Sequence, residues 1–158
     1  MIDGLLLLLM VYFITMNLTV ERCYCSMSVE ACAADGWLLG QETLDFCKQN
    51  NPLFLARPEW LRVATCASAY VFILGYALIA IAAACNMWAA LSLPIALFIG
   101  AKLYGIAFYH YMEFTSAMPP TNLVPYFAAE GPYIVSIVIV IRRLAGTMNS
   151  TPPRKKLA

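Results

Sequence analysis

Residues 123–143, LVPYFAAEGPYIVSIVIVIRR, limit most strongly what this chain can fold into. The segment is apolar almost throughout and holds one ionisable residue, Glu130, before it ends in Arg142-Arg143. A helix needs about 20 apolar residues to cross the ~30 Å hydrocarbon layer of a bilayer, so the segment is predicted to be a transmembrane helix. An acid inside such a helix is energetically costly, and Glu130 is therefore predicted to mark a functional site or to pair with another buried group.

The composition supports a membrane protein. Hydrophobic residues make up 62% of the chain and charged residues only 12%, whereas soluble domains carry about 25% charged residues. The formal net charge of +1 gives no reason to expect a nucleic-acid partner.

Three further apolar segments predict three more spans, at residues 4–20, 63–85 and 91–111. The first lacks a basic start and a small-residue cleavage site, so it is predicted to be an uncleaved signal anchor. The turn at 86–90 is short enough to make the second and third spans an antiparallel hairpin, and Pro94 is expected to interrupt the third. The predicted fold is an all-α bundle of four transmembrane helices over residues 1–145, followed by a polar basic tail at 146–158.

One long polar segment, residues 21–62, separates the first two spans. Its apolar residues within 36–47 predict a short helix lying on the membrane. Pro52 and Pro58 are expected to break any continuous helix before the second span.

The basic residues after the fourth span place the tail in the cytosol. Lys155 and Lys156 also form the KKxx ending of a retrieval signal for endoplasmic reticulum membrane proteins. The long loop then faces the opposite side, where an oxidising lumen permits disulfides.

The loop cysteines are Cys23, Cys25, Cys32 and Cys47. We expect Cys23 or Cys25 to pair with Cys32 or Cys47, and free thiols are the alternative. Their spacing matches no common zinc finger and the loop has no histidine, so no metal site is predicted. Cys66 and Cys85, in or at the end of the second span, are interpreted as small hydrophobic residues.

Four polar residues fall within or beside the last two spans: Lys102, His110, Glu113 and Glu130. Lys102, Tyr109 and Glu113 share a helix face. A structural Lys102–Glu130 pair is expected because buried charges are normally paired, with a ligand- or proton-handling site as the alternative. His110 and Glu113 are expected to be solvated near the membrane surface.

Several short motifs together resemble one family. They are Tyr12-Phe13, Asn51-Pro52-Leu53 with Pro58 and Trp60, Cys66, Pro94, and Pro132-Tyr133, closed by a dibasic end. Taken together they resemble the EXPERA-domain proteins, which comprise the sigma-2 receptor and the emopamil-binding sterol isomerases, and the receptor branch is the nearer of the two.

This resemblance implies a four-helix bundle with a pocket open to the bilayer that binds sterols or cationic amphiphiles, often in a homodimer of the endoplasmic reticulum. The receptor branch has acids where this chain has Tyr24, Asn51 and Ala67. The carboxylates that would bind an amine are therefore largely missing, and Glu130 partly replaces them at a position that is uncharged in the receptor.

We therefore expect a non-enzymatic membrane protein that binds a sterol or another lipid and needs no cofactor. The expected ligand-binding residues are Glu130, Tyr133, Asn51, Lys102, Tyr126 and Tyr70. No catalytic residue is predicted, because a sterol double-bond shift needs an acid and a base that converge, and only Glu130 is placed deep in a span. The alternative is an accessory subunit of a larger membrane complex, with a mitochondrial membrane as the alternative to the endoplasmic reticulum.

Overall fold

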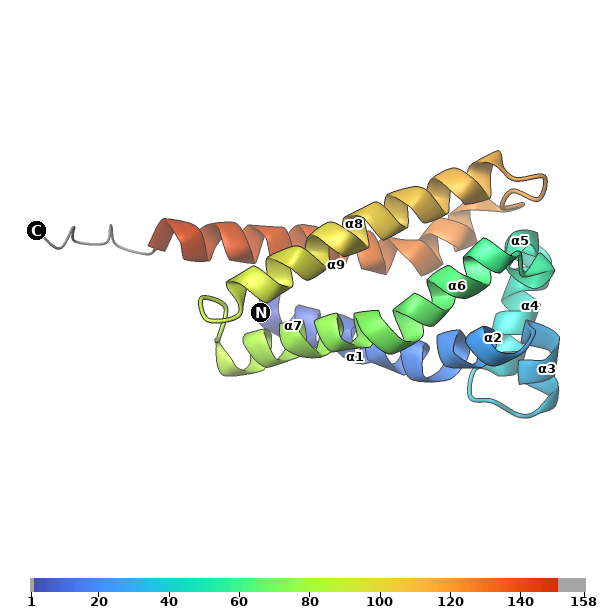
Figure 1. The fold of residues 1–158 in the computed structure, drawn as a ribbon, viewed down its shortest axis with the longest axis horizontal. Coiled ribbons are helices and arrows are strands. Elements are labelled where there is room, and N and C mark those ends of the chain that lie inside the picture. The colour runs from blue at the N-terminus through green and yellow to red at the C-terminus, as the bar shows by residue number, and fades with distance from the viewer. Residues whose placement is uncertain (1, 151–158) are drawn as a thin grey trace, which may run out of the picture.

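The computed structural model describes residues 2–150, which are almost entirely helical and contain no β-strand. Four helical segments are long and apolar enough to cross a membrane: Ile2–Ser26, Glu59–Cys85, Ser92–Thr115 and Leu123–Thr147. They lie roughly along one direction, as Figure 1 shows. The prediction of an all-α, four-span integral membrane protein is confirmed.

The first two spans each contain a π-helical turn. The first consists of α1 (Ile2–Met16), η1 (Asn17–Glu21) and α2 (Arg22–Ser26), and the second of α6 (Glu59–Ala67), η2 (Ser68–Phe72) and α7 (Ile73–Cys85). The two π turns contact each other, and Asn17 Nδ2 donates a 2.7 Å hydrogen bond to the Ser68 carbonyl. The first span therefore does not end near residue 20, as predicted, but continues to Ser26.

The last two spans are α8 (Ser92–Thr115) and α9 (Leu123–Ser150). Pro94 does not interrupt α8, because it lies in the first turn, where backbone N–H groups have no partner within the helix. α9 continues through residues 146–150, which are the first residues of the predicted polar tail. Lys155 and Lys156 lie outside the described residues.

The four spans form a closed ring, in which α1 packs against α7 and α9, and α8 packs against the same two helices. A cluster of buried apolar residues fills the half of the ring nearer the chain ends: Leu6, Met10, Phe13, Tyr76, Ile79, Ala82, Ala83, Trp88, Ile95, Ile99, Ile137, Val140 and Leu144. Gly75 lets α7 and α8 approach closely, since a Cβ there would come within 2.3 Å of the Phe98 ring.

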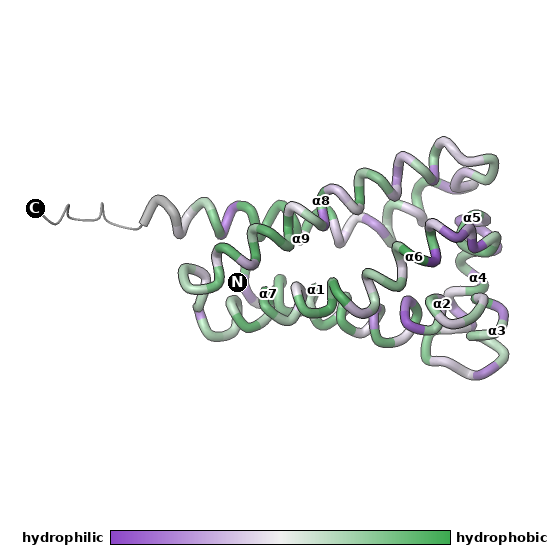
Figure 2. Tube along the Cα trace, in the orientation of Figure 1, coloured by the Kyte–Doolittle hydropathy of each residue, from purple (hydrophilic) through white to green (hydrophobic). Residues whose placement is uncertain are grey.

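Three short helices cover one end of the bundle: α3 (Val29–Ala34), α4 (Gly40–Asn50) and α5 (Pro52–Ala56). Figure 2 shows hydrophilic residues concentrated at this loop end and hydrophobic residues along the long helices. Pro52 begins α5 and Pro58 precedes α6, so both prolines separate helices as predicted. The predicted helix at 36–47 corresponds to α4, which begins and ends a few residues later.

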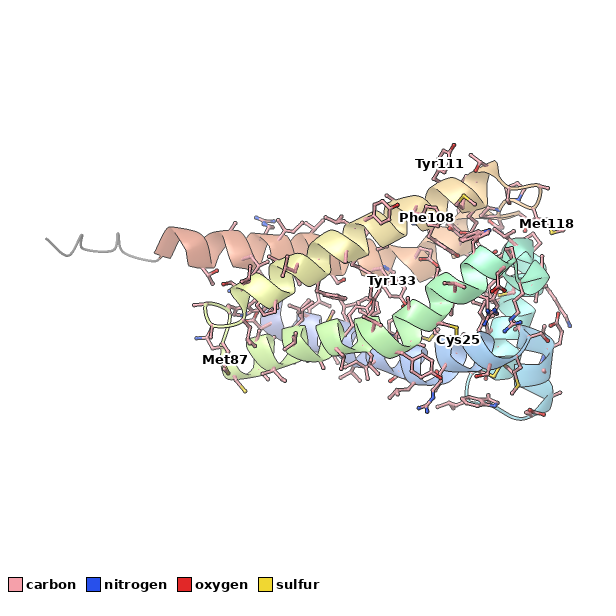
Figure 3. The ribbon with its side chains drawn as sticks, viewed as in Figure 1. Cys25, Met87, Phe108, Tyr111, Met118 and Tyr133 are labelled. Atoms are coloured by element: carbon pink, nitrogen blue, oxygen red, sulfur yellow. A yellow bond between two sulfur atoms is a disulfide. The ribbon has the colours of Figure 1, made fainter. Side chains whose placement is uncertain are left out.

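Two disulfides hold the loop end together. Cys23 pairs with Cys32, one of the expected combinations, whereas Cys25 pairs with Cys66 and so joins the first span to the second (Figure 3). The interpretation of Cys66 as a small hydrophobic residue was wrong. Cys47, a candidate for pairing in the sequence, keeps a free and buried thiol.

An ion pair holds the opposite end of the bundle. Arg143 Nε donates to Asp3 Oδ1 at 2.9 Å, and a second contact joins Arg143 Nη2 to Asp3 Oδ2. The first and last spans are therefore linked at the end where the chain begins and α9 ends.

Candidate functional site

The side chain of Lys102 lies inside the bundle among aromatic rings. The residue is only 9% exposed. Its Nζ is 4.6 Å from the ring centre of Tyr133, 5.1 Å from that of Phe72 and 5.4 Å from that of Tyr76. Ring faces attract a cation, and the attraction grows when water is excluded, so the three rings partly stabilise a charge buried in the membrane.

Lys102 does not form the predicted ion pair with Glu130. The ion pairs within residues 2–150 are Arg62–Glu59 and Arg143–Asp3. Lys102 instead interacts electrostatically with both Glu21 and Glu130, without direct contact, and makes no hydrogen bond within that part of the chain. The buried cation therefore keeps its three N–H donors free.

Glu21 is the member of this cluster that the sequence did not predict. It closes the π turn η1 inside the first span, where the sequence placed the end of the helix. Ser68 of the facing π turn lies within hydrogen-bonding reach of the Glu21 carboxyl group. The signal was present as Asn17 and Glu21, two polar residues four apart, but the first span was predicted to end at residue 20, before Glu21.

Three buried polar atoms on η1 and α7, around Glu21 and Tyr76, have no hydrogen-bond partner among the described residues. They are Glu21 Oε2, Asn17 Oδ1 and Tyr76 Oη. Each such atom costs about 1–3 kcal/mol relative to a satisfied one. Native structures keep few of them, and those that remain call for an explanation. Free acceptors and the free donors of Lys102 thus occur in the same part of the bundle.

Aromatic side chains form the apolar surroundings of this polar cluster. Phe13 stacks on Tyr133 with 4.2 Å between ring centres and contacts Tyr76 at 5.1 Å. Phe98 meets Phe72 and Tyr76 edge to face. Tyr133 lies between the α1–α7 pair and the α8–α9 pair in Figure 3.

A second polar network lies nearer the loop end, around Glu113. This residue is 0% exposed and accepts hydrogen bonds from the hydroxyls of Tyr109, at 3.0 Å, and of Tyr126. The Tyr126 hydroxyl also lies 2.9 Å from His110 Nδ1, and Asn51 Nδ2 donates to the Tyr109 hydroxyl at 3.3 Å. The expectation that Glu113 is solvated was wrong, because two tyrosines enclose it.

The residues expected to bind a ligand therefore fall into three groups. Glu130, Tyr133 and Lys102 lie in the Lys102 cluster, whereas Tyr126 and Asn51 belong to the Glu113 network. Tyr70 belongs to neither. It is 51% exposed on the outside of η2, where the Arg22 guanidinium lies 5.7 Å from its ring.

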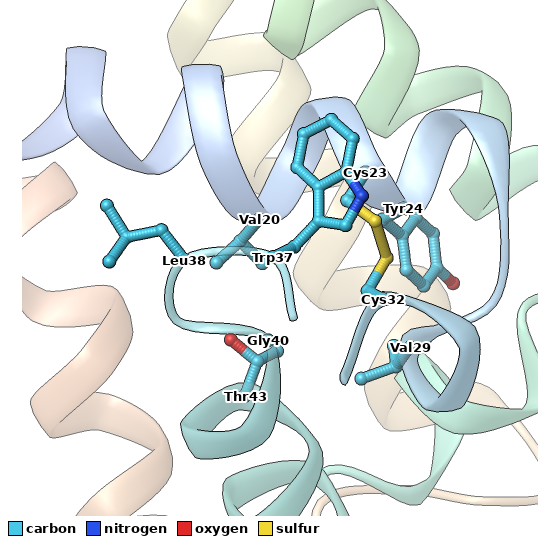
Figure 4. A pocket seen from close by; sticks show the side chains of 9 residues that line it. All are labelled: Val20, Cys23, Tyr24, Val29, Cys32, Trp37, Leu38, Gly40 and Thr43. Atoms are coloured by element: carbon cyan, nitrogen blue, oxygen red, sulfur yellow. A yellow bond between two sulfur atoms is a disulfide. The ribbon is translucent and has the colours of Figure 1, made fainter. Parts of the chain in front are cut away.

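A small crevice also lies at the loop end, beside the Cys23–Cys32 disulfide (Figure 4). Its volume is about 10 Å³, roughly the room that one water molecule needs. It is lined by Val20, Cys23, Tyr24, Val29, Cys32, Trp37, Leu38, Gly40 and Thr43. A sterol does not fit there. Residues 2–150 also contain no cluster of three or more side chains arranged to hold a metal ion.

The fold and the two buried polar groups define a four-span, all-α integral membrane protein with ionisable side chains inside the bundle. Comparisons with protein-family models, curated proteins and solved structures found no match.

Proposed function

We propose that this protein binds the hydroxyl end of a sterol or another membrane lipid at the Lys102 cluster, without transforming it. One observation carries the proposal. Lys102 and Glu21 interact electrostatically inside the bundle but do not touch, and each keeps free hydrogen-bonding capacity. A buried charge is normally paired, so a polar group between the two is the simplest way to satisfy both.

A hydroxyl suits this position because it accepts one hydrogen bond and donates another. It accepts from Lys102 Nζ and donates to Glu21 Oε2. Tyr76 Oη and Asn17 Oδ1 offer further partners for the same polar end. A ligand without a polar end leaves all these groups unsatisfied, so the cluster selects a hydroxyl-bearing lipid over a plain hydrocarbon.

The apolar body of the ligand lies against the aromatic side chains around the cluster. Phe72 and Tyr133 border the cluster with aromatic rings, and a rigid ring system such as that of a sterol packs against flat rings with little loss of conformational freedom. The sequence resemblance to EXPERA-domain proteins, which includes Pro132-Tyr133, supports the same ligand class. It also supports a homodimer.

We further propose the endoplasmic reticulum as the membrane in which the protein works. The two disulfides at the loop end suit an oxidising lumen.

Lipid binding is tested with a photoactivatable sterol on the protein in phosphatidylcholine nanodiscs. We expect crosslinks to peptides that contain Tyr76 and Tyr133. Glu21→Met and Lys102→Met should each weaken labelling roughly five- to tenfold, the effect of one lost hydrogen bond. Tyr104→Phe, which removes an exposed hydroxyl from the same helix as Lys102, is the control and should label as the wild type does. Labelling that neither substitution at the cluster reduces contradicts the proposal.

The competing proposal is a structural subunit of a larger membrane complex. In that case Lys102 and Glu21 serve only to hold the spans together. Native mass spectrometry in mild detergent separates the two, because a bound lipid supports the binding protein, whereas stoichiometric partner subunits without lipid support the structural role.

A further inference from the structure

With Glu113 as an ionised carboxylate, the proton positions in its network follow from counting donors. Each tyrosine hydroxyl has one proton. Tyr109 and Tyr126 both donate it to the Glu113 carboxylate. Each hydroxyl oxygen must therefore accept its other hydrogen bond. For Tyr109 the donor is Asn51 Nδ2 and for Tyr126 it is His110 Nδ1.

His110 is thereby held with its proton on Nδ1. A neutral imidazole has one N–H and one bare nitrogen, so Nε2 carries a lone pair and acts as an acceptor. Nε2 is buried and has no hydrogen-bond partner among the described residues. The Glu113–Tyr126 pair fixes which nitrogen is bare, as carboxylates do for histidines at catalytic and metal sites.

His110 lies near one end of α8. It lies five residues before Thr115, the last residue of α8, or roughly 7 Å along the axis. At this depth the apolar chains of a bilayer give way to its polar interface. The His110 ring contacts those of Phe114 and Phe127, at 6.4 and 6.0 Å between centres, and these two side chains are 41% and 43% exposed. The His110 ring therefore lies next to two aromatic side chains that are partly exposed.

We propose that His110 Nε2 accepts a hydrogen bond from the hydroxyl of a membrane alcohol, whose apolar body lies against Phe114 and Phe127. Because the imidazole offers only an acceptor, the ligand must supply a donor. Sterols and diacylglycerols carry an uncharged hydroxyl at interfacial depth on an apolar body, so both match the site. This site is separate from the Lys102 cluster, and its occupation does not depend on the function proposed there.

The first test reads the protonation of His110 directly. His110 is the single histidine of the chain, so isotope-labelled histidine gives one pair of imidazole nitrogen signals in nanodiscs. We expect Nδ1 to be protonated and Nε2 bare. Tyr126→Phe removes the acceptor of the Nδ1 proton and should move a large share of the proton to Nε2. Tyr111→Phe, an exposed tyrosine one residue away, should leave the signals unchanged. A wild-type signal from a protonated Nε2 overturns the proposal.

The second test adds matched lipids that differ in one donor. One pair is a sterol alcohol and the corresponding ketone, and the other is a diacylglycerol and the corresponding triacylglycerol. We expect one alcohol, or both, to shift the Nε2 signal while its donor-free partner shifts it at least roughly fivefold less. The pair that responds identifies the source of the ligand. Equal shifts from alcohol and donor-free lipid, or no shift from either pair, overturn the proposal.

A binding measurement completes the design. A photoactivatable version of the responding alcohol should crosslink near Phe114 and Phe127, and His110→Phe should reduce this labelling roughly five- to tenfold. Unchanged labelling in a His110→Phe protein that still purifies as a folded species contradicts the assignment.

Discussion

Some buried polar side chains of this protein are stabilised by a few specific hydrogen bonds. Glu113 is the clearest case, since two tyrosine hydroxyls satisfy a carboxylate that is fully buried. Hydrogen bonds to a charged acceptor contribute about 1.5–3 kcal/mol each, roughly twice as much as bonds between neutral groups.

Glu113→Gln should therefore destabilise the bundle by about 1–3 kcal/mol, because both hydroxyls lose a charged acceptor. The control is Glu59→Gln, whose ion pair with Arg62 is exposed and therefore contributes little to stability. Denaturation midpoints in mild detergent micelles compare the two. A Glu113→Gln protein as stable as the Glu59→Gln control contradicts the account.

The free thiol of Cys47 provides a second prediction. Burial, and to a lesser extent the charges of Glu113 and Glu30, raise its pKa from 9.0 to about 12. Between these values the unfolded thiol loses its proton while the folded one keeps it. Stability therefore falls as the pH rises from about 9 towards about 12.

Cys47→Ala should remove this part of the pH dependence, which thermal unfolding at several pH values above 9 measures. The thiol should also resist alkylation in the folded protein at neutral pH, since the thiolate is the reactive form. Rapid alkylation of Cys47 before unfolding contradicts both expectations.

Pairs of helices approach each other at specific small residues and covalent links. The close contact of α7 with α8 depends on Gly75, which faces the Phe98 ring. The contact of the first span with the second is fixed by Cys25–Cys66 beside two adjoining π turns.

Gly75→Ala should destabilise the protein by about 1–3 kcal/mol, because the added methyl group overlaps the Phe98 ring and forces the helices apart. Gly100→Ala is the matched control, since no atom lies within 4 Å of a Cβ at that helical position. The control should be neutral or stabilising by up to about 1 kcal/mol. Similar midpoints for the two variants contradict the packing account.

The two disulfides should differ in their contribution to stability. Cys25–Cys66 joins residues 41 apart in the sequence, whereas Cys23–Cys32 joins residues only 9 apart. The chain-entropy relation then gives about 4 kcal/mol for Cys25–Cys66 and about 3 kcal/mol for Cys23–Cys32. Paired serine substitutions compared under non-reducing conditions test this order, and a greater loss from the shorter loop contradicts it.

The sequence predicted elements better than it predicted side-chain partners. The four spans followed from long apolar runs, because the thickness of the bilayer sets their length. The inward position of Glu21 did not follow, since it depends on a π turn that propensities do not reveal. Glu113 was missed for a related reason. Its burial depends on Tyr126, which comes from another helix and is brought to it only by the packing of the bundle.

For the whole molecule, the two ends of the bundle differ chemically. The disulfides lie at the loop end, and the Asp3–Arg143 pair lies at the end where the chain begins. Disulfides persist in oxidising compartments, and basic residues after a span favour the cytosolic side. Both arguments predict that the loop end faces the oxidising compartment and that the opposite end faces the cytosol.

A glycosylation sequon inserted at Gly36, in the turn between α3 and α4, should therefore be modified during insertion into endoplasmic reticulum membranes. The natural Asn149-Ser150-Thr151 sequon should remain unmodified. A shift in gel mobility that an endoglycosidase reverses measures both. Modification at Asn149 instead of at the inserted sequon contradicts the predicted orientation and supports the opposite one.

The connectivity of Cys25 with Cys66 also constrains how the chain matures on the ribosome. Cys23, Cys25 and Cys32 emerge first, whereas Cys66 follows 41 residues after Cys25. During that interval Cys25 can compete with Cys23 for Cys32, and such a mispaired bridge is resolved only by thiol–disulfide exchange. Biogenesis of this protein should therefore depend on a disulfide isomerase more than on oxidising power alone.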